Sequence, residues 1–279
     1  MRFKEGDLVA FIDREGRTYL QRLASGGKFH SHRGYVTHEA AIGAVPGTVV
    51  SSSHGAKFYV FYPTLIDFTM NMPRKSGIIY PKDTSIILLW ADVFPGAKVL
   101  IGGVGSGALL LAVARQVGTS GVIVAYDVRE DMLEHAARNL REFVSELPDL
   151  TLKVGDIYEP IPEEGFDRVL LDVPEPWRAL PTLRKALVPG GIVCAYVPSI
   201  TQANNFVNAL KEAGSYALTE TLEVLVRNWH IAGRSVRPHH RMVGHTGFLS
   251  FARKLSAPET IAPLAAGSLE KTLPGTDEL

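Results

Sequence analysis

Four glycines lie close together in the segment VLIGGVGSGALLL, at Gly102, Gly103, Gly105 and Gly107. The residues before them are typical of a strand and those after them of a helix. Glycine leaves backbone amides open to a ligand, and amides at the start of a helix bind anionic groups. Asp127 stands 20 positions after Gly107 and ends the strand-like run GVIVAYD, where a carboxylate can accept hydrogen bonds from ribose hydroxyls. We therefore expect a pocket for a cofactor that contains adenosine.

This loop does not by itself decide which adenosine cofactor binds. Gly103, Gly105 and Ala108 also fit the G-x-G-x-x-A pattern of dinucleotide-binding proteins, and the glycines could simply allow a tight turn. Two acids further along the chain favour S-adenosylmethionine. Asp156 follows the third strand-like run, where it can recognise an adenine amino group, and Asp172 ends the run FDRVLLDV. An acid at that end of a strand lies in the ligand crevice of an open α/β sheet.

Strand-like and helix-like runs alternate through the middle of the chain, which predicts a mainly parallel sheet covered by helices. Residues 1–65, rich in Gly, Val, Phe and Tyr and broken by EG, GG and PG pairs, are expected to form a small β-rich N-terminal domain. Residues 66–255 are expected to form linker helices and a Rossmann-like α/β domain, which ends in two strand-like runs paired antiparallel. Residues 256–279 lack sustained periodicity and are expected to be a flexible tail.

Composition narrows the class of protein. The 279 residues are 46% hydrophobic and 21% charged, which allows a sizeable core and excludes wholesale disorder. Lys and Arg total 29 against 29 for Asp and Glu, so any surface for nucleic acid must be local. The single cysteine, Cys194, excludes an intramolecular disulfide and a four-cysteine zinc site. Because the sequence shows no signal-peptide pattern and no apolar run of the roughly 18 residues that a membrane span needs, we expect a cytoplasmic protein.

Several longer motifs resemble the single-polypeptide tRNA (adenine-58-N1)-methyltransferases of bacteria and archaea, over about residues 1–255. The shared pieces are PTLIDFTMNMPR, IIYPKD, VGSGAL, AYDVRED, GDIYE, RVLLDVPEPW and RPHHRMVGHTGFLSFARK, of which the last two are the most specific. The resemblance implies a class I (Rossmann-like) S-adenosylmethionine-dependent methyltransferase domain with a β-rich N-terminal domain, assembled as a homotetramer. The activity that it implies is transfer of a methyl group from S-adenosylmethionine to N1 of adenosine 58 in the T loop of tRNA.

The resemblance also implies a set of cofactor-binding residues. They are Gly103, Val104, Gly105, Ser106, Gly107, Asp127, Met132, Asp156 and Asp172. Asp172 is the predicted catalytic residue. A carboxylate that accepts a hydrogen bond from the N6 amino group of adenine would orient the ring and stabilise the positive charge that alkylation of N1 creates. The alternative is that Asp172 only caps the turn that contains Pro174 and Pro176.

Two positions depart from the family pattern. Ile101 stands before the glycine loop where the family usually carries Glu, and Asp127 stands where the ribose-binding acid is usually Glu. An acid at position 101 would accept a hydrogen bond beneath the methionine portion of the cofactor. Its loss predicts weaker cofactor binding.

Aromatic and basic residues are candidates for contacts to tRNA. A base turned out of folded RNA can stack on an aromatic ring, for which Tyr80 and Trp177 are candidates. The favoured alternatives are that Tyr80 belongs to the core and that Trp177 packs on the sheet edge. Between residues 227 and 254 the chain has six cations and no Asp or Glu, a local basic strip suited to phosphates. Arg237, Arg241 and His245 are the predicted substrate contacts within it, because they belong to the RP…HTGF ending.

Histidines form two further groups. His239 and His240 are adjacent, so their rings should diverge, and methyl transfer needs no metal; we expect no metal site. The N-terminal group is a second possible RNA-facing patch. Its members are His30, His32 and His38, near Lys28 and Arg33.

Three other functions stay open from sequence alone. A non-catalytic tRNA-binding subunit is favoured by Ile101 but disfavoured by the retained Asp127 and Asp172. A class I methyltransferase acting on a protein or a small molecule would share the core motifs, but not the HTGF ending or the N-terminal domain. A nicotinamide-dependent oxidoreductase would bind NAD in the same loop.

Overall fold

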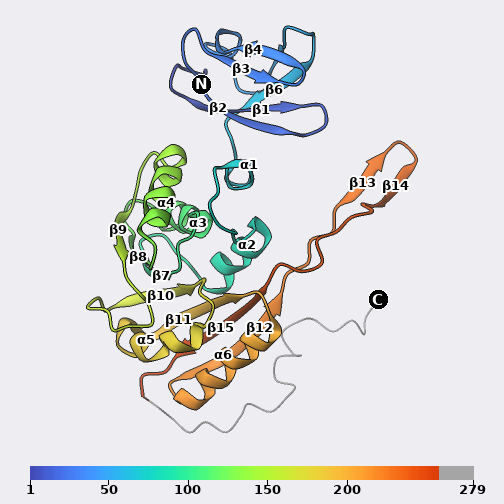
Figure 1. Ribbon diagram of the computed structural model, residues 1–279. Coiled ribbons are helices and arrows are strands. Elements are labelled where there is room, and N and C mark those ends of the chain that lie inside the picture. The colour runs from blue at the N-terminus through green and yellow to red at the C-terminus, as the bar shows by residue number, and fades with distance from the viewer. Residues whose placement is uncertain (258–279) are drawn as a thin grey trace.

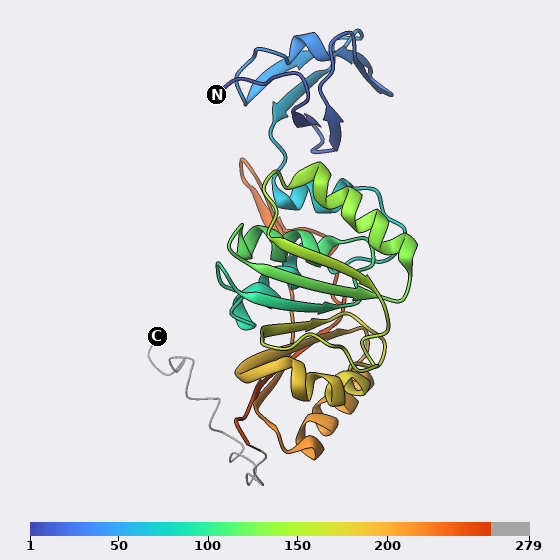
Figure 2. The same ribbon diagram turned by 90° about the vertical axis from the view of Figure 1, so that its left-hand side faces the viewer.

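The computed structural model describes residues 1–257. Figures 1 and 2 show a small β-rich part at the N-terminus, a larger α/β part, and a two-stranded arm that projects from the larger part. The predicted flexible tail at 256–279 lies, from residue 258 onward, outside the described residues. Within residues 1–257, every helix is too short or too polar to span a lipid bilayer.

The N-terminal part is built on a four-stranded antiparallel sheet in the order β2-β1-β6-β5. Its elements are β1 (Leu8–Asp13), β2 (Thr18–Arg22), β5 (Thr48–Ser51) and β6 (Lys57–Phe61), with a separate hairpin of β3 (Lys28–Ser31) and β4 (Gly34–Thr37) and a short 3-10 helix η1 (His38–Ala40). Along β6, Phe58 and Val60 are buried and Tyr59 is exposed, the alternation expected of a strand with one face on a core. Phe58 meets Phe29 of β3 edge to face at 5.6 Å. Such a pair contributes about 0.5–1.5 kcal/mol and holds the hairpin against the sheet.

Two helices connect this part to the main sheet, α1 (Leu65–Asn71) and α2 (Pro81–Trp90). Thr64 starts α1 with a capping box: its hydroxyl accepts from the Asp67 amide at 3.1 Å, and the Asp67 carboxylate accepts from the Thr64 amide at 2.9 Å. Pro81 stands at the first position of α2, where a missing N–H removes no helical hydrogen bond. These start signals leave residues 73–79 as an irregular segment between the two helices.

The larger part is built on a seven-stranded sheet in the order β12-β15-β11-β10-β7-β8-β9. Its strands are β7 (Lys98–Gly102), β8 (Val122–Asp127), β9 (Asp149–Val154), β10 (Phe166–Leu171), β11 (Leu187–Val197), β12 (Tyr216–Glu223) and β15 (Phe248–Lys254). The pairs among β7, β8, β9, β10 and β11 are parallel, and β15 runs antiparallel to both β11 and β12. The predicted Rossmann-like sheet with an antiparallel pair at its far end is confirmed.

Helices cover both faces of this sheet. They are α3 (Ala108–Val117), α4 (Glu130–Phe143), the 3-10 helix η2 (Pro176–Ala179), α5 (Leu180–Ala186) and α6 (Ile200–Ala213). One apolar core joins α2, α3 and α4 to one face of the sheet, and a second joins α5 and α6 to the other. From β7 the chain moves outward through β8 and β9, then returns to place β10 on the other side of β7. That reversal opens a crevice beyond the ends of β7 and β10.

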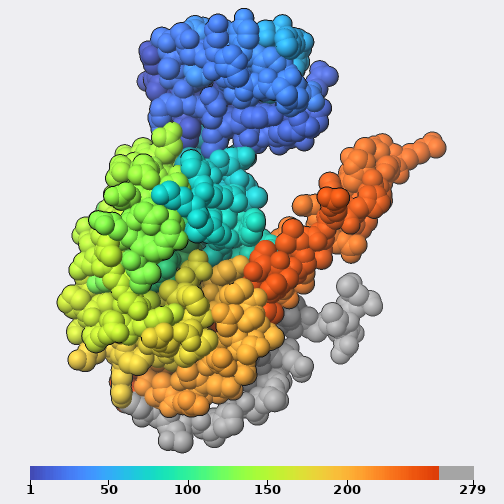
Figure 3. Space-filling view, viewed as in Figure 1, coloured from blue at the N-terminus to red at the C-terminus, as the bar shows by residue number. Residues whose placement is uncertain are grey.

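The arm interrupts the first of the two strand-like runs expected at the end of the α/β domain, ALTETLEVLVRNWHI. This run is not one strand: β12 ends at Glu223, and the chain leaves the sheet before forming β13 (Trp229–Ala232), which pairs with β14 (Ser235–Pro238). The arm stands clear of the body in the space-filling view (Figure 3). Leu225 is 59% exposed at its base. The apolar residues after Glu223, which suggested that the strand continues, therefore lie outside the sheet.

Candidate active site

The glycine loop follows β7 and passes directly beside the end of β10. Gly103 has a φ of +85°, and a Cβ there would lie 2.1 Å from the carbonyl oxygen of Asp172. The Asp172 amide donates to the Gly102 carbonyl at 2.8 Å, and the Gly103 amide donates to the Tyr126 carbonyl at 2.9 Å. Only glycine allows this approach, so the loop brings the ends of β7, β8 and β10 to one place.

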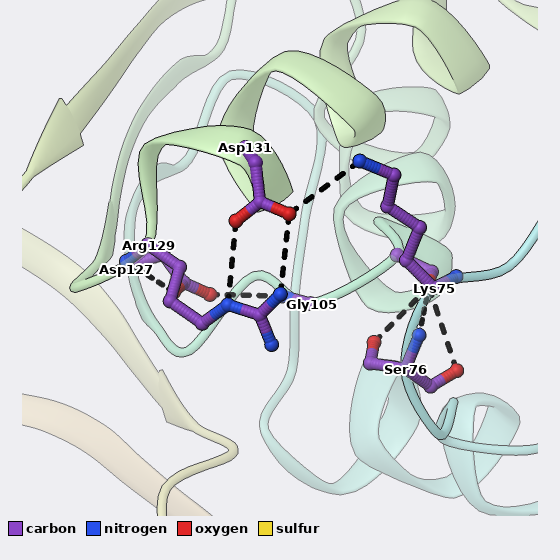
Figure 4. Close-up of polar contacts among 7 residues, drawn as sticks. Lys75, Ser76, Gly105, Asp127, Arg129 and Asp131 are labelled. Carbon is purple, nitrogen blue, oxygen red and sulfur yellow. Dashed lines mark hydrogen bonds and ion pairs between the residues drawn. The ribbon is translucent and has the colours of Figure 1, made fainter.

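Asp127, at the end of β8, holds the glycine loop in its shape (Figure 4). One carboxylate oxygen accepts from the amides of Val104 and Gly105, each at 3.0 Å. The other accepts from the Arg129 amide at 3.0 Å. Sequence reasoning assigned this acid to the ribose hydroxyls. Each oxygen of an ionised carboxylate has two lone pairs, so these bonds leave one on the Arg129 side for a ligand.

A segment that sequence reasoning did not assign lies over the loop. The amides of Lys75 and Ser76 both donate to the Ser106 hydroxyl at 3.1 Å. Asn139 of α4 donates to the carbonyls of Pro73 at 3.1 Å and Ser106 at 2.9 Å. A Cβ on Gly105 would lie 2.9 Å from the Ser76 hydroxyl. Residues 73–77 therefore form a cover on the glycine loop, with Ser106 as the shared acceptor.

Charged side chains fasten this cover from outside. Figure 4 shows Asp131, in the first turn of α4, between Lys75 and Arg129. Its carboxylate lies 3.4 Å from the Lys75 ammonium and 3.1 Å from the Arg129 guanidinium. The hydrogen bond from Arg129, with that from Lys75, lowers the pKa of Asp131. All three side chains are about half exposed, so solvent screening keeps this attraction small.

A cavity of about 390 Å³ opens beside the loop, at the carboxyl ends of β7, β8, β9 and β10. It is lined by Gly103, Tyr126, Asp127, Val128, Gly155, Asp156, Ile157, Tyr158, Asp172, Val173, Pro174 and Glu175. The structure thus brings together three predicted site acids, Asp127, Asp156 and Asp172, with Gly103. A volume of this order suits a small-molecule ligand.

Asp172 and Asp156 have different surroundings in this cavity. Burial, with a smaller contribution from the negative charge of Asp127, raises the pKa of Asp172 to about 6. One carboxylate oxygen of Asp156 instead accepts a hydrogen bond from the Tyr158 amide at 2.9 Å. The Tyr158 hydroxyl in turn accepts a hydrogen bond from the Glu175 amide at 2.9 Å. The loops after β9 and β10 are thereby joined across the mouth of the cavity.

The other predicted cofactor and base-stacking residues do not line the cavity. Val104, Ser106 and Met132 are buried behind the loop. Trp177 is partly buried in η2 and packs against the α5 and α6 core. Tyr80 is 40% exposed at the N-cap of α2.

Tyr196 of β11 is a candidate that sequence reasoning missed. Its hydroxyl donates to the Thr246 carbonyl at 2.8 Å, and a Cβ on Gly247 would lie 2.5 Å from its ring. Burial raises its pKa to about 12, and the negative charge of Asp83 adds to that effect. No local pattern marks this tyrosine, which looks like an ordinary strand residue.

The basic strip lies on and around the arm. Arg237 is in β14, and Arg241 follows it; neither lines the cavity of its own chain. His245 is fixed at the base of the arm between two acceptors, the Glu223 carboxylate at 2.6 Å and the Pro198 carbonyl at 2.8 Å. The hydrogen bond to Glu223 raises the pKa of His245, which favours the doubly protonated ring that two acceptors require.

A larger hollow of about 850 Å³ lies elsewhere, between the N-terminal part and the ends of α3 and α4. Arg22 crosses it to the Glu142 carboxylate at 2.8 Å. It contains neither the glycine loop nor the three strand-end acids. We therefore place the candidate active site in the smaller cavity. The described residues contain no group of three or more metal-ligating side chains.

Comparison with known proteins finds relatives along most of the chain. The family described as tRNA methyltransferase complex GCD14 subunit matches residues 57–237, and the TrmI-like N-terminal family matches residues 2–50. The chain is 39% identical over 246 residues to the tRNA (adenine(58)-N(1))-methyltransferase TrmI of Thermus thermophilus, with 88% of this chain and 96% of the relative covered. It is 32% identical over 267 residues to the tRNA (adenine(57)-N(1)/adenine(58)-N(1))-methyltransferase TrmI of Methanocaldococcus jannaschii, covering 87% and 93%.

Two solved structures share the whole architecture. A SAM-dependent O-methyltransferase from Thermotoga maritima superposes with a TM-score of 0.87 at 35% identity, covering 92% of this chain and 96% of the other. The tRNA (m1A58) methyltransferase TrmI from Aquifex aeolicus superposes with a TM-score of 0.80 at 28% identity, covering 92% and 100%. The class I methyltransferase fold expected from the motifs is therefore confirmed.

Proposed function

The chain belongs to the GCD14/TrmI family of tRNA methyltransferases, and on that basis we propose that it transfers a methyl group from S-adenosylmethionine to N1 of adenosine 58 in the T loop of tRNA. The observation that carries this function is the meeting of the glycine loop with Asp127, Asp156 and Asp172 around one cavity. These are the groups expected to hold an adenosine cofactor next to a reacting base.

The residues present fit S-adenosylmethionine. The open backbone at Gly103 and Gly105 suits the approach of its methionine end, Asp127 would accept from its ribose, and Asp156 would contact its adenine. When bound, it supplies an electrophilic methyl group. Ile101 is fully buried in the core that joins α2, α3 and α4 to the sheet, so the family's acid is replaced by an apolar side chain. Asp127 then provides the carboxylate that holds the loop, and we expect weaker cofactor affinity than in the Glu-containing relatives.

Asp172 is the proposed catalytic residue. The N1 lone pair forms the new bond to the methyl carbon while the carbon–sulfur bond breaks, and the adenine ring acquires a positive charge. A carboxylate that accepts from the N6 amino group holds the ring in line and stabilises that charge, most effectively where burial excludes water. With a pKa of about 6, Asp172 is ionised at neutral pH and can act in this way.

Tyr80 and Tyr196 are proposed to border the substrate adenine. Tyr196 contacts the Thr246 carbonyl, and Tyr80 directly precedes α2, whose Asp83 accepts from the Thr246 hydroxyl, so the two rings are held by one network. The partly exposed ring of Tyr80 can stack on a base that has been turned out of the RNA. Trp177 is a weaker candidate, since its ring already packs on the α5 and α6 core.

Assembly into a homotetramer is part of the proposal. The arm exposes large apolar side chains, including Trp229 at 56%, Ile231 at 74% and Val236 at 60%. A two-stranded hairpin is marginally stable alone, and exposed apolar patches mark protein contacts. Packing of the arm against a second copy would cover it and carry Arg237 and Arg241 to a tRNA-binding surface shared between copies. The proposed location is the cytoplasm, where tRNA substrates occur.

The test is methyl transfer from labelled S-adenosylmethionine to unmodified tRNA transcripts, with a transcript carrying guanosine at position 58 as control. Label that is lost with the guanosine transcript supports the reaction and its position. Label on neither transcript, with cofactor bound, would favour a non-catalytic subunit, or a class I methyltransferase with a protein or small-molecule substrate.

A further inference from the structure

Three segments of the N-terminal part meet on one face, away from the cavity described above. They are the turn between β1 and β2, the β3–β4 hairpin, and the turn at residues 52–54 (Figure 1). The Ser52 hydroxyl donates to the Arg33 carbonyl at 2.5 Å, and the Tyr35 amide donates to the Ser53 hydroxyl at 3.2 Å. The Arg17 guanidinium reaches His32 at 3.0 Å. These contacts make one continuous surface from segments distant in sequence.

Two guanidinium groups converge at the centre of this surface. Arg17 Nη1 and Arg33 Nε lie 3.0 Å and 3.2 Å from the same ring nitrogen, Nε2 of His32. That nitrogen has one lone pair, so the two guanidinium groups share a single acceptor. Guanidinium N–H groups without a full partner are suited to bind an anion such as phosphate.

Each of these two arginines has one acid beside it. Glu15 pairs with Arg33 at 2.7 Å, and the buried Asp13 lies 3.8 Å from Arg17. The backbone of the β1–β2 turn is itself fixed, because Asp13 accepts from the amides of Glu15 at 3.0 Å and Arg17 at 2.9 Å. Arg17 is therefore presented on a fixed turn and Arg33 on the neighbouring β3–β4 hairpin, and each guanidinium has five N–H donors, more than these contacts use.

Further cations extend the surface. The Lys28 ammonium lies 4.7 Å from the centre of the Tyr35 ring, and the His30 ring lies 5.8 Å from that ring on the same hairpin. Lys57 lies beyond them, on the strand after the 52–54 turn. A cation held over an aromatic ring loses less freedom when it binds, so Lys28 is positioned in advance for a phosphate.

We infer that this surface, which we call the N-terminal basic face (Arg17, Lys28, His30, His32, Arg33, Tyr35 and Lys57), binds phosphates of the tRNA backbone outside the T loop target. The inference rests on the proposed function, since it assigns a second contact to the same substrate. Across the chain, Lys and Arg balance Asp and Glu at 29 each, so a local excess of fixed cations is where an RNA backbone would bind. The groups present bind phosphate without reading a base, so they position the RNA and add no sequence preference.

The test compares Arg17→Gln/Lys28→Gln with Lys185→Gln/Lys211→Gln, a control pair that makes the same charge change on exposed lysines of α5 and α6. We expect the first variant to weaken binding of full-length tRNA about tenfold or more at low salt. The slope of log affinity against log salt should fall by about 0.9 for each phosphate that the variant no longer neutralises. Its kcat at saturating tRNA and its affinity for S-adenosylmethionine should match wild type, since neither residue lines the cavity.

Each outcome decides one point. Equal losses in the two variants would overturn the assigned surface while leaving the methyltransferase function in place. A wild-type protein that binds S-adenosylmethionine but labels no tRNA would overturn the proposed function. Because the Arg17 variant could misfold, Lys28→Gln is also tested alone, with its thermal unfolding measured. The Lys28 ammonium lies over an exposed ring, so its loss should not unfold the protein.

Discussion

The carboxylate of Asp83 is fully buried and accepts a hydrogen bond from the Thr246 hydroxyl at 2.7 Å, across 163 positions of sequence. The Lys82 ammonium completes this network, 2.8 Å from Asp83, 2.6 Å from Thr246 and 2.7 Å from the carbonyl of Val224. The network ties the first turn of α2 to both ends of the arm. It thereby fixes Tyr80, which precedes α2, and the Thr246 carbonyl that Tyr196 contacts.

Lys82→Met should destabilise the protein by about 3 kcal/mol, because it leaves Asp83 as an unpaired buried carboxylate. The free energy of unfolding in urea measures this, with Lys185→Met as the exposed control. The methylation rate should fall as well, since Tyr80 and Tyr196 lose their common support. A loss of stability no larger than that of the control would show that the ion pair contributes little.

Asp172→Asn should lower kcat about a hundredfold or more while leaving the affinity for S-adenosylmethionine within a fewfold of wild type. The amide keeps the shape of the side chain but removes the negative charge that stabilises alkylated adenine. Single-turnover methylation and calorimetric cofactor titration separate the two effects. An Asn variant with near wild-type turnover would remove Asp172 from the catalytic role.

The pKa of Asp172 sets the expected pH dependence. Because the ionised form is the active one, kcat/KM should fall as pH decreases through about 6 and level off above it. The folded-state pKa also exceeds the ordinary value of about 3.9, so ionising this group opposes folding above pH 6 and its cost disappears as pH falls toward 4. Asp172→Asn should therefore raise stability at pH 7 by ~1–3 kcal/mol and abolish that limb of the rate profile. A profile with no limb near pH 6 in wild type would contradict this.

Gly103→Ala should abolish tight cofactor binding, because its Cβ would lie 2.1 Å from the Asp172 carbonyl and push β7 and β10 apart. Gly118→Ala is the matched control: its φ is also positive, at +65°, but nothing lies within 4 Å of the added carbon. The control should be destabilised by about 1 kcal/mol, the strain of placing alanine in a left-handed backbone conformation. Calorimetric titration of both variants with S-adenosylmethionine measures the difference, and equal affinities would contradict the close-approach account.

Ile101→Glu restores the family's acid but should not restore affinity. Ile101 is fully buried in an apolar cluster, so a carboxylate there would be desolvated at a cost of several kcal/mol. Ile101→Val, expected to cost about 0.5–1.5 kcal/mol, controls for altered packing. Thermal unfolding and cofactor titration report the two effects. A Glu variant that is stable and binds more tightly would show that the cluster can accommodate the acid.

The features that could be predicted from the sequence are those that strand order determines. Asp127 ends β8, and Asp156 and Asp172 follow β9 and β10. The carboxyl ends of parallel strands meet at one edge, so a common cavity for the three acids could be expected. The cover formed by Lys75 and Ser76 could not, because its hydrogen bonds to Ser106 join segments about 30 residues apart without any periodic signal. The same holds for the link from Asp83 to Thr246.

The arm shows the opposite limit. The apolar residues of its first half predicted a strand that continues β12. In the structure the chain leaves the sheet at Glu223, and Trp229 and Ile231 are exposed. A local pattern cannot distinguish an apolar side chain buried in a sheet from one on a projecting arm. Burial depends on tertiary contacts, which the local pattern does not specify.

The most direct test of the account is to map the modified nucleoside. Wild-type protein and Asp172→Asn are each incubated with S-adenosylmethionine and an unmodified tRNA transcript, and the product is digested and analysed by mass spectrometry with positional mapping. The account predicts 1-methyladenosine at position 58 with wild type and about a hundredfold less with Asp172→Asn. A methyl group on another atom or position, or equal product from both proteins, would contradict it.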